Sequence, residues 1–211
     1  MQYKFRNHII KRTCTSIYSE HSLYKPALQK DFNNRCAYCN LLDSTITTPF
    51  EVDHFIPKKI FKGIFDEFDT LYENLIYSCK KCNMTKSSKY SGELVKIVVE
   101  NLEFYNPAEI DMNEIFFRNE YGFIMSSDIK GKEMILKLNL HYPIHALAWI
   151  LERINYLADA YEFKIKKCTE FDKKNQYENI HNRLNFFYRK LNSFFVKNYN
   201  NKYLDISRLL D

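Results

Sequence analysis

The alternation of hydrophobic and polar residues predicts short mixed elements in the first part of this chain. Residues 50–56 alternate apolar and polar side chains, as a half-buried strand does. Residues 71–77 form a second apolar stretch, and residues 79–89 suit a helix rich in lysine. Residues 19–32 also predict a helix, with Pro26 tolerable in its first turn. Short elements of both kinds in this order indicate an α+β core.

The pattern changes near residues 89–92, and longer helices follow. Residues 97–99 and 104–107 predict strand and turn, residues 115–125 a hairpin, and residues 131–138 a short helix. Apolar residues then recur at helical spacing over residues 144–165 and 184–195, which predicts two long amphipathic helices. We therefore expect two regions, 1–90 with the core and 91–211 with the hairpin and a mainly helical C-terminal region.

Composition narrows the class of protein. A chain of 211 residues with 45% hydrophobic residues has enough apolar material for a folded core, which excludes a disordered protein. Only 4 glycines and 5 prolines disfavour an all-β fold with many tight turns. The net charge of +5 is compatible with an anionic partner. No secretory signal is visible, and the longest apolar run is too short to span a bilayer, so we expect a cytoplasmic protein without a membrane segment.

Four of the six cysteines form two C-x-x-C pairs, Cys36 with Cys39 and Cys79 with Cys82. In a reducing compartment such pairs bind metal more often than they form disulfides. Two pairs complete the tetrahedral four-sulfur site that structural zinc prefers. Zinc ribbons and zinc-bearing binding modules share this feature, so the cysteines alone predict only a domain held together by zinc.

The residues between and after the cysteine pairs suggest chemistry. Asp53 and His54 are adjacent, Asn74 precedes the second pair, and Asn83 and Lys86 follow it. Taken together with the cysteines, residues 32–88 resemble the HNH, or ββα-metal, endonuclease family in its four-cysteine variant. The last His of the family motif is replaced here by Asn83, a variant that is common in the family.

The resemblance implies a role for each of these residues. His54 is expected to be the general base, and Asn74 to brace the loop and orient His54. Asp53 and Asn83 are expected to hold a catalytic Mg²⁺ or Mn²⁺, ions that prefer oxygen ligands. Lys58 and Lys86 are expected to contact nucleic-acid phosphates.

The predicted function is hydrolysis of a nucleic-acid backbone, of DNA in preference to RNA. The tail adds weaker similarities at residues 104–107, at residues 138–140 and at Arg153. They resemble small bacterial HNH proteins, including the nuclease subunit of Septu-type anti-phage pairs, which imply an ATPase partner. A homo-oligomer is the other expected assembly, because Phe186 and Val196 fall off the apolar stripe of the last helix. The alternative is a non-catalytic zinc-dependent module that binds nucleic acid or docks a partner.

Overall fold

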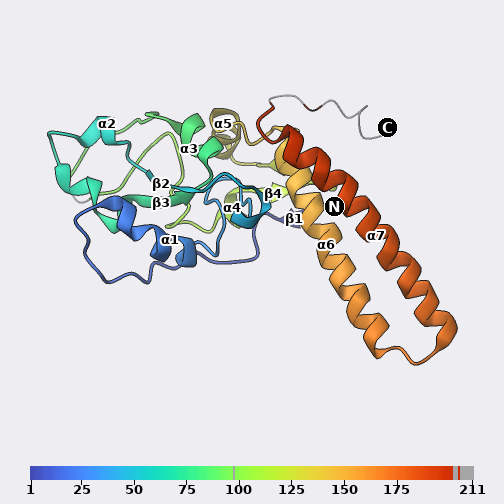
Figure 1. Cartoon of the computed structure of the whole chain (residues 1–211). Coiled ribbons are helices and arrows are strands. Elements are labelled where there is room, and N and C mark those ends of the chain that lie inside the picture. The colour runs from blue at the N-terminus through green and yellow to red at the C-terminus, as the bar shows by residue number, and fades with distance from the viewer. Residues whose placement is uncertain (97, 202–203, 205–211) are drawn as a thin grey trace. The chain divides into compact units, whose positions relative to one another are not determined.

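The computed structural model describes residues 1–96, 98–201 and 204, and it divides into two compact units (Figure 1). The first unit comprises Met1–His141, and the second begins at Tyr142. The following paragraphs treat each unit by itself.

A β-hairpin followed by a helix forms the centre of the first unit (Figure 1). Strand β2 (Glu51–His54) pairs antiparallel with β3 (Leu75–Ser78), and Asp53 lies opposite Ile76. Helix α3 (Lys80–Lys86) begins directly after β3. Every residue of β3 is buried, which explains its continuous apolar sequence. The expected α+β class with a ββα core is confirmed.

The expected N-terminal helix consists of two parts. A 3-10 turn, η1 (His21–Tyr24), leads into α1 (Lys25–Asp31), which carries a proline at its start. The helix ends there because Asn33 and Asn34 adopt positive φ angles of 54° and 56°. Helix α1 contacts both β2 and β3, and its Leu28 is buried.

The connection between the two central strands carries several short helical turns. They are α2 (Lys58–Phe61), η3 (Asp66–Asp69) and η4 (Tyr72–Asn74), with η2 (Asp43–Thr45) placed before β2. Ile56, Phe61 and Phe68 form a buried cluster inside this connection. The cluster gives the connection its own small core beside the hairpin.

A second small sheet and two helices complete the first unit. Strand β4 (Phe117–Arg118) pairs with β5 (Ile124–Met125) on one side and with β1 (Tyr3–Lys4) on the other. Helices α4 (Met112–Ile115) and α5 (Ile129–Lys137) flank them in sequence. The predicted hairpin and short helix are confirmed, whereas the sequence did not indicate the pairing with β1.

The expected strand and turn over residues 97–99 and 104–107 are found only in part: the described residues there form no strand, a turn begins at Pro107, and Ile97 lies outside the described residues. Asparagine side chains make the local backbone hydrogen bonds instead. Asn101 Oδ1 accepts from the backbone N–H groups of Ser91 and Glu103. Such bonds satisfy backbone donors without a neighbouring strand.

The seam expected near residue 90 lies inside the first unit. The chain after it bonds back to the chain before it: Asn101 Nδ2 donates to the Lys89 carbonyl, and Arg118 donates to the Cys39 carbonyl at 3.2 Å. These long-range bonds join the ββα centre to the later elements. The division into compact units therefore comes at residues 141 and 142.

The second unit is a pair of long helices, α6 (Pro143–Lys167) and α7 (Phe171–Asn198), which run antiparallel and side by side (Figure 1). Tyr161 and Tyr177 join them edge to face, with ring centres 5.7 Å apart. The two predicted helices are confirmed, although the expected helical region extended to residue 210, and residues 202–203 and 205–211 lie outside the described residues. None of the helices in the described part combines the length and the apolar character needed to cross a membrane.

Candidate functional site

The four cysteines of the two C-x-x-C pairs come together in the first unit. Their sulfur atoms all lie within 4.8 Å of one another, and all four residues are buried. Hydrogen bonds from the other three thiols, that of Cys36 foremost, hold the pKa of the Cys79 thiol well below its ordinary range. Four converging sulfurs, one of them favoured as thiolate, fit a tetrahedral metal site of the kind that zinc occupies.

Asp53 lies in the interior next to this cysteine cluster. Its Oδ1 accepts a hydrogen bond from Lys86 Nζ at 2.9 Å, and its Oδ2 accepts one from the Tyr38 hydroxyl at 2.7 Å. Burial raises the pKa of Asp53, although the Lys86 ammonium opposes that shift. Asp53 is only 5% exposed and Lys86 is fully buried. The two form an internal ion pair.

This ion pair bears on two expectations from the sequence: that Lys86 contacts a phosphate and that Asp53 holds a divalent ion. Lys86 has no exposed surface, so it does not reach a phosphate in this conformation. An ion at Asp53 would have to displace the ammonium from Oδ1. Asn83 donates to Glu51 Oε2 at 2.8 Å, with no hydrogen bond to Asp53 among the described contacts. As found, Asp53 and Asn83 are bonded to Lys86 and Glu51, so a catalytic Mg²⁺ or Mn²⁺ at this pair would need both side chains to change partners.

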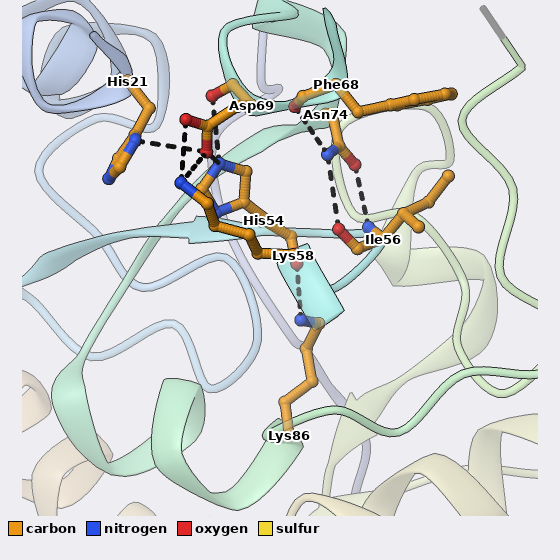
Figure 2. Close-up of polar contacts among 8 residues, drawn as sticks. All are labelled: His21, His54, Ile56, Lys58, Phe68, Asp69, Asn74 and Lys86. Atoms are coloured by element: carbon orange, nitrogen blue, oxygen red, sulfur yellow. Dashed lines mark hydrogen bonds and ion pairs between the residues drawn. The ribbon is translucent and has the colours of Figure 1, made fainter. Parts of the chain in front are cut away.

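His54 faces a different environment at the end of β2 (Figure 2). Its Nε2 lies 3.0 Å from the carbonyl oxygen of Asp69 and 3.1 Å from Asp69 Oδ1. The His21 ring stands edge-on to the His54 ring at 4.8 Å, and the Phe61 ring is 5.6 Å away. Burial lowers the pKa of His54, and the hydrogen bond with Asp69 only partly offsets that effect. The imidazole is therefore kept neutral at neutral pH.

Asp69 is the centre of the polar group around His54. Lys58 Nζ lies 2.8 Å from its Oδ1 and 2.9 Å from its Oδ2, and His21 Nδ1 lies 3.5 Å from Oδ1 (Figure 2). Burial alone would raise the pKa of Asp69, but Lys58 and the imidazoles outweigh it and lower that pKa. Lys58, expected to contact phosphate, is thus paired with a carboxylate while remaining half exposed.

Asn74 ties the connection between the strands together from inside. Its Oδ1 accepts from the Ile56 N–H at 2.8 Å, and its Nδ2 donates to the carbonyl oxygens of Ile56 and Phe68 (Figure 2). Asn74 is completely buried. Because Phe68 precedes Asp69, these bonds fix the turn that presents Asp69 to His54. The structure thus places Asn74 as a brace of the loop, one step removed from the imidazole.

We compared the sequence with models of known protein families. Residues 36–89 match the family model described as HNH endonuclease. These residues form an HNH domain. The domain spans both cysteine pairs, β2, β3 and α3, together with the connection that carries Asp69.

Two curated relatives are similar to a larger part of the chain. One is the Septu protein PtuB of Bacillus thuringiensis, 34% identical over 56% of this chain and 40% of the relative. The other is the Septu protein PtuB of Bacillus mycoides, 28% identical over 56% of this chain and 46% of the relative. The chain thus spans less than half the length of either relative. No solved structure matches.

A cleft borders the HNH domain on the side of η1. It has a volume of about 340 Å³, and among its lining residues are His21, Lys25, Glu51, Val52 and Lys80. His21 lines the cleft and also contacts the His54 ring, so the cleft adjoins the imidazole. Two lysines at its wall give it positive charge, which suits a phosphate-bearing ligand.

The sequence did not reveal two members of the group, His21 and Asp69. His21 precedes the HNH domain, and Asp69 lies 15 residues beyond His54 in a connector without periodicity. A histidine before the motif and an aspartate inside a mixed loop carry no signal of their own. Only the packing of η1 and η3 beside the end of β2 brings them to His54.

Proposed function

We propose that this chain is an endonuclease that hydrolyses phosphodiester bonds of nucleic acid, DNA in preference to RNA, with His54 as the general base. One observation carries the proposal: within an HNH domain, a largely buried, neutral imidazole is held by Asp69 beside a cleft lined with lysines. A zinc-dependent module that only binds would have no need for an imidazole oriented in this way.

The contacts of His54 indicate which ring nitrogen carries the proton. Nε2 faces the carbonyl oxygen of Asp69, which only accepts hydrogen bonds, so Nε2 carries the proton and Nδ1 the lone pair. We propose that Nδ1 takes the proton from the water that attacks phosphorus. A neutral imidazole near pH 7 suits that step, and Asp69 then stabilises the imidazolium that forms.

The phosphate contacts in this proposal come from the wall of the cleft. Lys25 and Lys80 line it, and both are available to neutralise phosphates beside the reacting bond. Lys58 joins them only when it releases Asp69, with which it is now paired. The substrate would then lie along η1 and the start of β2.

The resemblance to the HNH family implies two metal ions, a structural one at the four cysteines and a catalytic one at Asp53 and Asn83. The cysteine cluster would hold one zinc ion as a structural clamp. Dependence on Mg²⁺ or Mn²⁺ is part of the proposal as well, although Asp53 and Asn83 are otherwise engaged in this conformation.

The relatives suggest a biological setting. Both bear the name Septu protein PtuB, and the tail of this chain resembles that nuclease subunit as well. We propose that the protein acts in anti-phage defence with an ATPase partner. Co-purification with a tagged ATPase encoded beside it tests this part separately from the chemistry.

A cleavage panel tests the proposed reaction. Purified protein is incubated with plasmid, linear DNA, single-stranded DNA and RNA, with and without Mg²⁺ or Mn²⁺. We expect divalent-dependent cutting of DNA that falls at least ~100-fold in His54→Ala, the scale of losing a general base. His8→Ala is the matched control and should cut as the wild type does.

Two outcomes would contradict the proposal. His54→Ala that cuts at the wild-type rate would remove His54 from the chemistry. Wild-type protein that binds the substrates but cuts none of them, alone or with its partner, would favour the non-catalytic binding module.

A further inference from the structure

Three metal-binding side chains meet at His54, and they come from three separate elements. His21 belongs to η1, His54 ends β2 and Asp69 ends η3. One donor atom from each residue lies within 4.8 Å of the other two. The three side chains converge as Figure 2 shows. None of them belongs to the cysteine cluster or to the Asp53–Asn83 pair, so they are an additional donor set.

The spacing of these atoms resembles the edges of a coordination polyhedron. Nitrogen and oxygen ligands bind zinc at about 2.1 Å, which sets neighbouring donors about 3.0 to 3.5 Å apart in tetrahedral or octahedral geometry. The two edges that meet at Asp69 Oδ1 measure 3.1 Å to His54 Nε2 and 3.5 Å to His21 Nδ1. These two edges match that spacing, and the two histidine donor atoms lie within 4.8 Å of each other.

The shared oxygen provides a second, independent observation. Asp69 Oδ1 is shielded from solvent, yet within the described part of the chain it accepts no hydrogen bond of normal geometry. Its close neighbours are all cationic or potentially cationic groups: Lys58, His21 and His54. A buried oxygen without a hydrogen bond, facing one ammonium and two imidazoles, is a suitable ligand for a metal ion.

Lys58 does not prevent binding. Its ammonium contacts both Asp69 oxygens, at 2.8 and 2.9 Å, and its side chain is 48% exposed. It can keep the outer oxygen or turn to solvent while Oδ1 binds an ion. Its charge would still repel that ion, so Lys58 weakens the site without closing it.

We propose that His21, His54 and Asp69 form a second metal site, one that takes a divalent transition-metal ion such as Zn²⁺, Co²⁺ or Ni²⁺ in preference to Mg²⁺. Two imidazoles and one carboxylate make the donor set softer than the oxygen ligands that Mg²⁺ requires. The site uses a residue from outside the HNH domain, His21.

Binding at this site would compete with the proposed role of His54, and this consequence rests on the proposed function. An ion takes the lone pair of Nε2, so the ring proton moves to Nδ1. Nδ1 then has no lone pair with which to accept a proton from water. A transition-metal ion at this site therefore inhibits the nuclease that Mg²⁺ or Mn²⁺ supports.

Binding is measured first, without reference to cleavage. Zinc-loaded protein is titrated with Co²⁺ and followed by calorimetry and by visible absorption. We expect one further equivalent of Co²⁺ with the spectrum of nitrogen and oxygen ligands, without the strong thiolate charge-transfer band that exchange into the cysteine cluster would give. His21→Asn and Asp69→Asn should each weaken binding at least ~10-fold.

Two further variants exclude a general effect on folding. His8→Asn should bind Co²⁺ as the wild type does. Lys58→Met should bind it about threefold more tightly, because it removes an exposed charge from the site. A gain in affinity cannot arise from damage to the fold.

The proposal fails if zinc-loaded protein binds no second equivalent, or if His21→Asn and Asp69→Asn bind it unchanged. In a cleavage assay with Mg²⁺, Zn²⁺ should inhibit the wild type, and the Zn²⁺ concentration that halves each protein's own rate should be at least ~10-fold higher for His21→Asn. A second Co²⁺ in a protein that cuts nothing would overturn the proposed function and leave the metal site standing.

Discussion

Asp53 and His54 are neighbours in the chain but belong to different surroundings. The Asp53 carboxylate bonds with Lys86 and Tyr38 in the interior, whereas the His54 ring contacts Asp69 and His21. Successive side chains of a strand leave it in opposite directions, which accounts for the separation. Asp53 therefore ties α3 to β2, whereas His54 belongs to the polar group around Asp69, the group to which we assign the proposed chemistry.

The buried ion pair gives a prediction about stability. Lys86→Met removes the partner of Asp53 and leaves an uncompensated charge in the interior, so we expect a loss of about 3 to 5 kcal/mol in the free energy of unfolding. The double variant with Asp53→Asn should recover part of that loss. Urea denaturation of zinc-loaded protein measures both.

The matched control for this pair is Lys80→Met, on the exposed part of the same helix. It should change the unfolding free energy by less than about 0.5 kcal/mol. If Lys86→Met were equally harmless, the ion pair would contribute little to stability. Lys86 could then leave Asp53 to contact a phosphate, and Asp53 could bind a divalent ion.

Among the elements, α3 depends most on the cysteine cluster. The helix has only seven residues, too few to be stable by itself, and Cys79 Sγ accepts a hydrogen bond from the Cys82 N–H at its first turn. A metal on the four sulfurs would join this helix to the turn at Cys36 and Cys39.

Removal of the metal tests that dependence. We expect one zinc per chain by elemental analysis, and a chelator should lower the melting temperature strongly because metal binding is part of the folding free energy. Cys82→Ser should lose the zinc. Cys14→Ser and Cys168→Ser, which change cysteines outside the cluster, should retain it. Folded, active protein without zinc would refute the assignment.

For the whole molecule, the open question is assembly, and α7 suggests where it takes place. Phe186, Phe187 and Val196 expose 54%, 50% and 53% of their surface. The rings of Phe186 and Phe187 lie 5.8 Å apart, so these two exposed aromatics form one apolar spot on α7, and Val196 adds a further exposed apolar side chain on the same helix. Exposed large apolar side chains of this kind are found at interfaces.

Replacing Phe186 and Val196 with serine tests whether α7 associates. We expect an unchanged melting temperature and a loss of association with a second copy or with the ATPase partner, followed by light scattering and by pull-down. Phe163→Ser is the control, since it changes an exposed aromatic on the other helix. A lower melting temperature with unchanged association would mean that Phe186 and Val196 serve the fold alone.

The sequence by itself determined which four cysteines cluster, the ββα order and the two long helices. Each of these depends on local spacing: C-x-x-C turns, the alternation around β2 and apolar residues at helical intervals. It also indicated His54 as the candidate general base, because that residue follows Asp53 in the part of the chain that matches the HNH family model. Such features depend only on residues close together in the sequence, so the sequence alone predicts them.

The tertiary structure alone decided which side chains surround His54. His21 and Asp69 reach it only because the η1 turn and the end of η3 pack beside β2. The Lys86–Asp53 pair spans 33 residues and forms only when α3 lies on the hairpin. No local pattern encodes such contacts, since they depend on how separate elements pack together. Packing, rather than the motif, therefore determines that Lys86 pairs with Asp53 and that Asp69 lies beside His54.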